Sequence, residues 1–156
     1  MARTALFTVA MLPLAACSGG FPADPDGTLE RIREEGLLRV GAAPHPPQVE
    51  ITTLGAEPTG TEVDLVEAYG DHLGVDVEWV VGTESTLFEA LHDGEVDLVV
   101  GGLQHNSLFA SEAGFTRPYV EEKAGDGETV KRVVATPMGE NALLSDLERF
   151  LDGEVN

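Results

Sequence analysis

The fold is decided by the stretch Gly94-Glu95-Val96-Asp97-Leu98-Val99-Val100-Gly101-Gly102. Its middle part, Val96–Val100, is apolar enough for a strand buried on both faces, as strands of parallel sheets are. Upstream, residues 37–42 and 75–81 are predicted as two further strands, because both are rich in apolar and β-branched side chains. A helical pattern separates each strand from the next. The order strand, helix, strand, helix, strand predicts an α/β fold with a mostly parallel sheet flanked by helices.

Both of these intervening helices carry a sequence signal for their first turn. Thr61 is predicted to cap the first helix, with Asp64 three residues on, and the helix ends before Gly74. Thr86 and Glu89 form the same pattern at the start of the second helix. Apolar residues recur every three or four positions in both, so each helix has one face to bury against the sheet.

The remaining segments complete one layer of this fold. Residues 29–35 are predicted as a short first helix, and the proline-rich residues 43–59 as a loop. Residues 121–128 are predicted as a polar connector, residues 129–136 as a further strand, and Asn141 as the cap of a last helix. The predicted buried side of that helix is Leu143, Leu144, Leu147, Phe150 and Leu151.

The charge of the chain limits its partners. It has 28 acidic against 9 basic residues, a formal net charge of −19 with histidine neutral. Such a surface repels phosphate backbones, so no nucleic-acid partner is expected. The acidic residues are spread along the chain without a long block of like charge, which is typical of a well-solvated surface, although a basic protein partner is an alternative.

The amino-terminal residues have the pattern of an export signal. A basic start, a short apolar run and small residues predict a signal peptide over residues 1–16, and the run ends in Leu-Ala-Ala before Cys17. This ending is similar to a bacterial lipobox, in which Cys17 would receive lipid; the alternative is an ordinary signal peptide with an incidental cysteine. Residues 17–27 are predicted as a tether, 28–151 as a single domain and 152–156 as a tail.

Four phrases in a fixed order carry a family resemblance. They are Leu29–Gly41, Gly94–Gly102, Phe115–Tyr119 and Pro137–Leu144. Together they resemble the bacterial extracellular solute-binding proteins of family 3, the polar amino-acid receptors of ABC importers. That family has a second lobe between the third and fourth phrases, where this chain has only residues 120–136. Because a domain needs at least about 50 residues, the resemblance implies a single periplasmic-binding-protein-like lobe without the second lobe.

The resemblance also implies where and with what the protein works. It implies an exported protein, anchored to the cell membrane by lipid and facing the periplasm or the cell exterior. The implied partners are a small polar solute and either an ABC permease or a sensor protein. The alternatives are an interaction or sensory lipoprotein that kept the scaffold but lost transport, and a truncated inactive receptor.

Ligands of open parallel sheets bind beyond the carboxyl ends of the strands. This rule brings the loops 43–47, 82–86 and 101–109 around one spot. The candidate ligand-binding residues in these loops are His45, Glu84, Gln104, Asn106 and Phe109.

Several of these candidates also have a structural interpretation. His45 lies among prolines and suits an exposed loop, Glu84 suits a solvated position before a helix, and Asn106 suits a turn in which its side chain bonds its own backbone. By resemblance, Phe109 stands where the family has the arginine that holds the carboxylate of an amino acid. Arg117 could replace that arginine, but its place in the hinge phrase favours a surface role.

No pattern of an enzyme active site is found in the sequence. It lacks a His-x-x-x-His pair, a Gly-x-Ser-x-Gly turn, a phosphate-binding glycine loop and a second cysteine. We therefore expect a protein that is not an enzyme and that uses no cofactor or metal. A few members of the resembled family are dehydratases, so an enzyme on this scaffold is the alternative.

Overall fold

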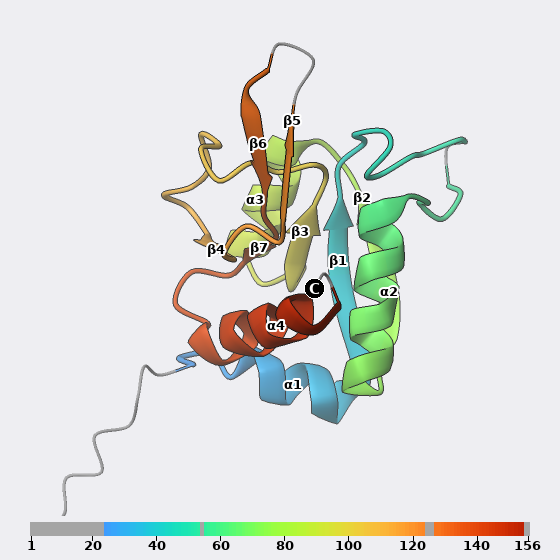
Figure 1. Ribbon diagram of the computed structural model, residues 1–156. Coiled ribbons are helices and arrows are strands. Elements are labelled where there is room, and N and C mark those ends of the chain that lie inside the picture. The colour runs from blue at the N-terminus through green and yellow to red at the C-terminus, as the bar shows by residue number, and fades with distance from the viewer. Residues whose placement is uncertain (1–23, 54, 124–126, 155–156) are drawn as a thin grey trace, which may run out of the picture.

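Three parallel strands form the centre of the computed structural model (Figure 1). The model describes residues 24–53, 55–123 and 127–154. β1 (Leu37–Ala42) pairs with β2 (Asp76–Val81) on one side and with β3 (Leu98–Val100) on the other. The carboxyl ends of these strands therefore meet at one edge of the sheet, as the sequence predicts.

Two short antiparallel strands extend the sheet. β7 (Ala135–Thr136) pairs with β3, and β4 (Gly114–Phe115) pairs with β7, so the strand order is β2-β1-β3-β7-β4. The fold is thus a mixed α/β lobe with a mostly parallel sheet, which confirms the predicted fold class.

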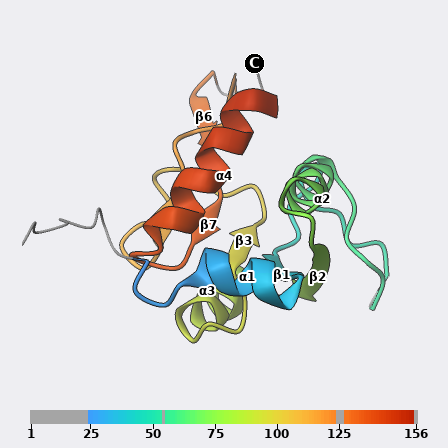
Figure 2. The same ribbon diagram turned by 90° about the horizontal axis from the view of Figure 1, so that it is seen from below.

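Four helices surround the sheet. α3 (Glu84–His92) lies on one face, and α2 (Thr61–Leu73) and α4 (Asn141–Glu154) lie on the other, while α1 (Thr28–Glu35) crosses the end where β1 begins (Figure 2). No helix among the described residues is long and apolar enough to cross a bilayer.

β3 is buried on both faces because a core lies on each side of it. Leu98 packs into the core under α2 and α4, and the next residue, Val99, packs into the core under α3. Successive strand side chains point to opposite faces, so this short apolar strand joins the two cores. Of the five predicted buried residues of α4, four are buried and Leu144 is half-buried.

The predicted connector and the predicted last strand form a hairpin instead. β5 (Val120–Lys123) pairs antiparallel with β6 (Thr129–Arg132), and this two-stranded unit rises beyond the end of the sheet where β1 stops (Figure 1). The prediction of one strand over 129–136 was therefore wrong, because β6 and β7 join different sheets. The hairpin lies in the part of the chain where the resemblance implies that a second lobe would be inserted.

The predicted cap residues lie one to three positions inside their helices. Thr83, not Thr86, caps α3: its hydroxyl accepts a hydrogen bond from the Thr86 amide, and the Thr86 hydroxyl accepts one from the Thr83 amide. Gly60 precedes α2 with a φ of 128°, and a Cβ there would lie 2.4 Å from the Gln48 carbonyl oxygen. A close approach of two backbones, rather than a side-chain cap, therefore fixes the start of α2.

The last helix is capped from the far end of the chain. Asn141 is its first residue, and the Asp24 carboxylate accepts a hydrogen bond from the Ala142 amide at 3.2 Å. α4 continues to Glu154, three residues beyond the predicted end of the domain.

Candidate functional site

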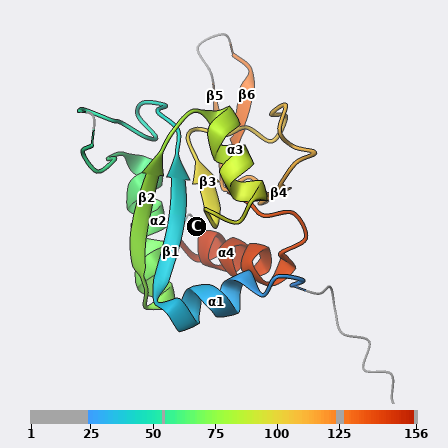
Figure 3. The ribbon, with the colours of Figure 1, turned by 180° about the vertical axis from the view of Figure 1, so that it is seen from behind.

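Loops from three parts of the chain meet at the carboxyl end of the parallel strands. Figure 3 shows the start of α3 and the β5–β6 hairpin at this same end of the sheet. His45 N–H and C=O both pair with Val49, and Gln104 forms an isolated bridge with Arg132. These backbone pairs hold the loop after β1 and the loop after β3 in place.

A hollow of about 270 Å³ lies between these loops. Its lining residues are His45, Glu84, Gly102, Leu103, Gln104, Asn106, Ser107 and Leu108. Among the described residues, the side chains of Glu84, Gln104 and Asn106 have no hydrogen-bond partner. The structure therefore brings four of the five candidate residues to one hollow that opens to solvent.

Phe109 does not line this hollow. Its ring stacks on Phe88 with centroids 4.4 Å apart and an interplanar angle of 8°, and it packs against the core under α3. Arg117 is exposed and pairs with Glu148 and Asp152 of α4, in line with the surface role favoured for it. No guanidinium group lines the hollow.

Gly102 brings the two loops into close contact. Its φ is 66°, and a Cβ built on it would lie 2.1 Å from Cδ2 of His45. The residue therefore must be glycine both for its left-handed backbone and for the approach of the imidazole ring.

A buried polar network lies directly beneath the same loops, and sequence reasoning did not find it. Glu62 of α2 is 1% exposed. One of its carboxylate oxygens accepts hydrogen bonds from the Gly101 and Gly102 amides at 2.9 and 2.8 Å, and the other accepts one from the Tyr119 hydroxyl at 2.5 Å. Burial, followed by the charge of Glu62 and the hydrogen bond to it, raises the pKa of Tyr119, so the phenol stays protonated.

Arg132 joins this network to the hollow. Its guanidinium donates to the Gly102 carbonyl oxygen at 2.6 Å, pairs with Glu122 at 2.7 Å, and lies 3.4 Å from Nε2 of His45. One signal in the sequence could have revealed part of this network. Glu62 precedes the buried Val66 and Tyr69 by four and seven positions, so an acidic residue occupies the apolar face of a helix.

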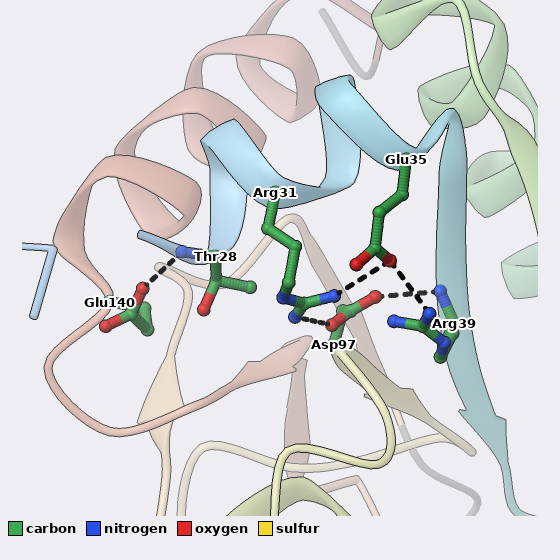
Figure 4. A network of polar contacts seen from close by, with 6 residues as sticks. All are labelled: Thr28, Arg31, Glu35, Arg39, Asp97 and Glu140. Carbon is green, nitrogen blue, oxygen red and sulfur yellow. Dashed lines mark hydrogen bonds and ion pairs between the residues drawn. The ribbon is translucent and has the colours of Figure 1, made fainter. Parts of the chain in front are cut away.

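A second polar cluster lies at the opposite end of the sheet (Figure 4). Asp97 is fully buried, and it accepts hydrogen bonds from the Arg31 guanidinium at 2.6 Å and from the Arg39 amide at 2.9 Å. Glu35 pairs with both of these arginines. This cluster ties α1 to the start of the sheet and leaves Asp97 no free oxygen.

Glu140 fixes the chain just before α1. Its two carboxylate oxygens accept hydrogen bonds from the Asp26 amide at 3.0 Å and the Thr28 amide at 2.8 Å. Burial by itself would raise the pKa of Glu140, but these hydrogen bonds outweigh it and hold the pKa below its ordinary value. The nearby carboxyl of Asp24 has a raised pKa because of its burial and the charge of Glu140.

The described residues contain no group of three or more His, Cys, Asp and Glu side chains placed to hold a metal ion. Cys17, the predicted lipidation site, lies outside the described residues.

The arrangement agrees with a known family of binding proteins. The sequence model of bacterial extracellular solute-binding proteins, family 3, matches residues 38–153. This chain belongs to that family. Domain 1 of TmArgBP in its arginine-bound form superposes with a TM-score of 0.70 at 24% identity, over 79% of this chain and 97% of that chain. Because the match spans nearly the whole of that separate domain, the fold is that of one lobe.

The relatives found by sequence are longer proteins named as murein transglycosylases. Membrane-bound lytic murein transglycosylase F of Idiomarina loihiensis is 28% identical over 151 residues, which cover 96% of this chain and 31% of that protein. The protein of the same name from Photobacterium profundum is 40% identical over 100 residues, covering 63% of this chain and 19% of that protein. The chain thus spans about a third or less of the length of these relatives.

Proposed function

We propose that the protein is a single-lobe receptor for a small polar solute, and that the solute binds in the hollow after β1 and β3. One observation carries the proposal: His45, Glu84, Gln104 and Asn106 come from three separate loops and line one hollow. Three of these side chains have no partner among the described residues, so they are available to a ligand. The family match supports the same role.

The chemistry of the hollow favours a ligand rich in hydrogen-bond donors. Glu84 offers a carboxylate, Gln104 and Asn106 offer amide groups, and no guanidinium is present to hold a carboxylate. Phe109, at the position that the resemblance assigns to that arginine, is packed against Phe88 instead. We therefore propose a solute with hydroxyl or ammonium groups and expect ordinary amino acids to bind only weakly.

A single lobe covers only one side of a ligand, so affinity is expected to be low. Small-molecule sites usually bury about 70–90% of the ligand surface. The solved domain 1 of TmArgBP is nevertheless described as arginine-bound, which supports ligand binding by an isolated lobe of this fold.

Three six-carbon compounds derived from glucose test the proposed site. D-glucosamine carries an ammonium group, D-glucose only hydroxyls, and D-gluconate a carboxylate. Calorimetric titration should give the tightest binding for glucosamine and the weakest for gluconate, because Glu84 lies in the hollow. Glu84→Gln should lower glucosamine affinity about tenfold, whereas Glu95→Gln, at an exposed position outside the hollow, should leave it unchanged. Tight binding of gluconate, or of any amino acid at micromolar concentration, would contradict the proposed solute class.

The receptor could act either in solute transport or in a sensory module. The resemblance favours a transport component that delivers solute to an ABC permease. The murein transglycosylase relatives favour a non-catalytic sensory module for a cell-wall process, since nearly the whole chain aligns with about a third of a longer protein. We favour the sensory module, because the β5–β6 hairpin stands where the second lobe would supply an open-to-closed change.

Two measurements separate these candidates. Adjacent genes for a permease and an ATPase, together with solute uptake that depends on this protein, would support transport. Release of soluble fragments from purified murein by the protein would contradict a non-catalytic role.

We also propose that the protein is exported and anchored to the cell membrane by lipid on Cys17. The proposal rests on Leu-Ala-Ala-Cys after a short apolar run, and on a family described as extracellular. Two acyl chains hold a protein firmly at a membrane, since each buried methylene contributes about 0.8 kcal/mol. Cys17→Ala should move the protein from the membrane fraction to the soluble fraction. An intact mass without lipid from a native bacterial host would contradict the anchor.

A further inference from the structure

β2 is the outer strand of the five-stranded sheet, and no described strand pairs with its other side (Figure 3). A hollow of about 520 Å³ lies along this free edge, between β2 and the loop that precedes α2. We propose that the edge binds an extended segment of another protein as an additional strand, and that basic and apolar side chains alternate in this segment. The inference goes beyond the proposed function and does not depend on it.

The free backbone groups of β2 are the first argument. The Asp76 and Gly82 amides donate to carbonyl oxygens on the β1 side, at 3.0 and 3.2 Å. Because every second residue of a strand bonds to the same neighbour, the backbone groups of Val77, Trp79 and Val81 point away from β1. They have no hydrogen-bond partner in the part of the chain that the structure describes. Trp79 and Val81 line the hollow, so this edge can be reached from solvent.

The length and regularity of the edge are the second argument. Natural sheet edges are commonly short, bulged or interrupted by proline, which prevents pairing with other chains. β4, at the other edge, has only two residues, whereas β2 pairs with β1 over six consecutive residues without a bulge. Val80 and Val81 are 37% and 45% exposed. A regular, exposed edge of this length can accept a further strand.

Charge determines which partner fits this edge. Asp76 and Glu78 are exposed on β2, and Glu57 lines the hollow together with Glu78. Among the described residues, none of these three carboxylates has an ion-pair partner, and no basic residue lines the hollow. A second copy of β2 would bring like charges together, in a chain whose formal net charge is already −19. The edge therefore disfavours a second copy and favours a basic segment.

The two faces of β2 set the pattern of the segment. Asp76 and Glu78 lie on one face and are exposed, whereas Trp79 lies on the other face and packs against the core under α2. An added strand continues both faces of a sheet. It would place basic side chains beside Asp76 and Glu78, and apolar side chains beside Trp79 and Val81.

Three capped hexapeptides test the pattern. The full chain is titrated with Lys-Val-Lys-Val-Lys-Val, Lys-Lys-Lys-Val-Val-Val and Glu-Val-Glu-Val-Glu-Val at about 0.15 M ionic strength, which screens nonspecific attraction to the acidic surface. The alternating basic peptide should bind at least about tenfold more tightly than either control. At about ten times its Kd, it should slow hydrogen exchange of the Trp79 and Val81 amides about tenfold. The Val80 amide, which is directed to β1, should change little.

Blocked backbone amides separate strand addition from attraction by charge. Every second amide of an added strand faces its neighbour. Two versions of the alternating basic peptide, one N-methylated at its valines and one at its lysines, carry the same charge, but only one keeps the amides that face β2. That one should bind nearly as the parent does, and the other at least about tenfold more weakly. Loss with the methylated valines indicates an antiparallel segment, and loss with the methylated lysines a parallel one.

Four variants locate the binding edge. Val81→Pro removes one outward amide while sparing the bonds to β1, and Glu78→Lys reverses a charge beside the hollow; each should weaken the alternating basic peptide at least about tenfold. Glu95→Lys makes the same change in net charge at an exposed position outside the hollow, and it should have no such effect. Glu84→Gln should weaken only glucosamine binding and Glu78→Lys only peptide binding, so failure of one proposal is distinguishable from failure of the other.

Three results would overturn the inference. The first is equal or absent binding of the alternating basic peptide and its block-sequence control, which would leave only attraction by charge. The second is equal affinity of the two N-methylated peptides. The third is a dimer of the chain alone with slowed exchange at Trp79 and Val81, which would assign the edge to a second copy. If Val81→Pro fails to fold, Glu78→Lys with its control Glu95→Lys locates the site.

Discussion

The two ends of the parallel sheet use buried polar groups in different ways. At the end where β1 begins, Asp97 and Glu140 are buried, and both oxygens of each carboxylate accept hydrogen bonds from fixed donors (Figure 4). Nη1 of Arg31 there has no hydrogen bond among the described residues, but it lies 3.6 Å from the Glu35 carboxylate, so its charge is paired. At the end where β1 stops, Glu62 is satisfied in the same way, but the groups around it are not. Three side chains that line the solute hollow have no partner among the described residues, Leu108 is 93% exposed, and the hollow opens to solvent.

This contrast separates groups that stabilise the fold from groups that remain available to a ligand. A buried charge with all its hydrogen bonds made fixes neighbouring segments, whereas unpartnered groups beside a hollow raise the free energy of the empty protein. Substitutions at the first end should therefore change stability, and substitutions at the second should change binding.

Asp97→Ala should give the largest effect. Removing this carboxylate takes away the acceptor of the Arg39 amide and leaves the Arg31 guanidinium only its longer pair with Glu35. Two hydrogen bonds to a charged group are lost, each worth about 1.5–3 kcal/mol, so the free energy of unfolding should fall by about 3–5 kcal/mol. Urea denaturation measures it. The control Asp71→Ala, at an exposed position of α2, should change stability by less than about 0.5 kcal/mol. Equal losses of stability in Asp97→Ala and Asp71→Ala would contradict the stabilising role assigned to this end of the sheet.

Gly102→Ala should affect both stability and binding. A Cβ at this left-handed position costs about 1–2 kcal/mol, and displacement of the His45 ring adds about 1 kcal/mol. Gly94→Ala is the matched control, because Gly94 also has a positive φ of 74° but open space around its Cα. Glucosamine binding should be lost only in Gly102→Ala. Intact binding in this variant would show that His45 does not contact the solute.

Glu140→Gln should destabilise the protein by about 1.5–3 kcal/mol at neutral pH. The two carboxylate oxygens of Glu140 each accept one hydrogen bond, from the Asp26 and Thr28 amides, whereas the glutamine side chain has only one oxygen. Because the pKa of Glu140 is lowered in the folded protein, its contribution is present above the unfolded pKa of about 4.3 and is lost as the pH falls through the folded pKa. Asp24, whose pKa is raised, acts in the opposite direction.

Hydrogen exchange between pH 7 and pH 3 measures this contribution. The Asp26 and Thr28 amides of the wild type should lose protection on acidification, and Glu140→Gln, which keeps one acceptor oxygen, should protect them less than the wild type at pH 7 and should change less on acidification. Glu154→Gln, at an exposed position near the end of α4, serves as the control and should behave as the wild type. Equal protection of residues 26–28 in Glu140→Gln and wild type would show that this carboxylate does not hold the segment.

Leu108→Ser should have the smallest effect on stability, within about 0.5 kcal/mol, because the side chain is almost fully exposed. It should nevertheless change glucosamine affinity several-fold, since Leu108 lines the solute hollow. Met138→Ser is the control: Met138 is 55% exposed and lies away from both proposed sites. A change in affinity for Met138→Ser alone would move the solute site to another face.

The sequence predicted the elements whose signals are local. β1 spans residues 37–42 as predicted, and the α4 pattern gave the correct buried face with the exception of the half-buried Leu144. Predictions failed where a distant segment decided the outcome. The strand over 129–136 divides because Arg132 pairs opposite Val120 while Ala135 pairs with Val99 and Phe115.

The candidate site shows the same division. The rule for open parallel sheets was enough to select the three loops that meet, because strand direction alone determines which loops share an edge. It could not assign each side chain a direction within its loop. Phe109 packs on Phe88, and Glu62 and Arg132 form the network beneath the loops, each through contacts with residues far away in the sequence.

The sequence by itself therefore determined the order of elements, the parallel sheet, the family and the edge that carries the candidate site. These properties follow from hydrophobic period, chain direction and short motifs, which are local in the chain. Only the tertiary structure decided which polar groups are satisfied and which face a hollow. Hydrogen bonding and burial depend on what lies across a few ångströms of space, and a linear pattern does not record those neighbours.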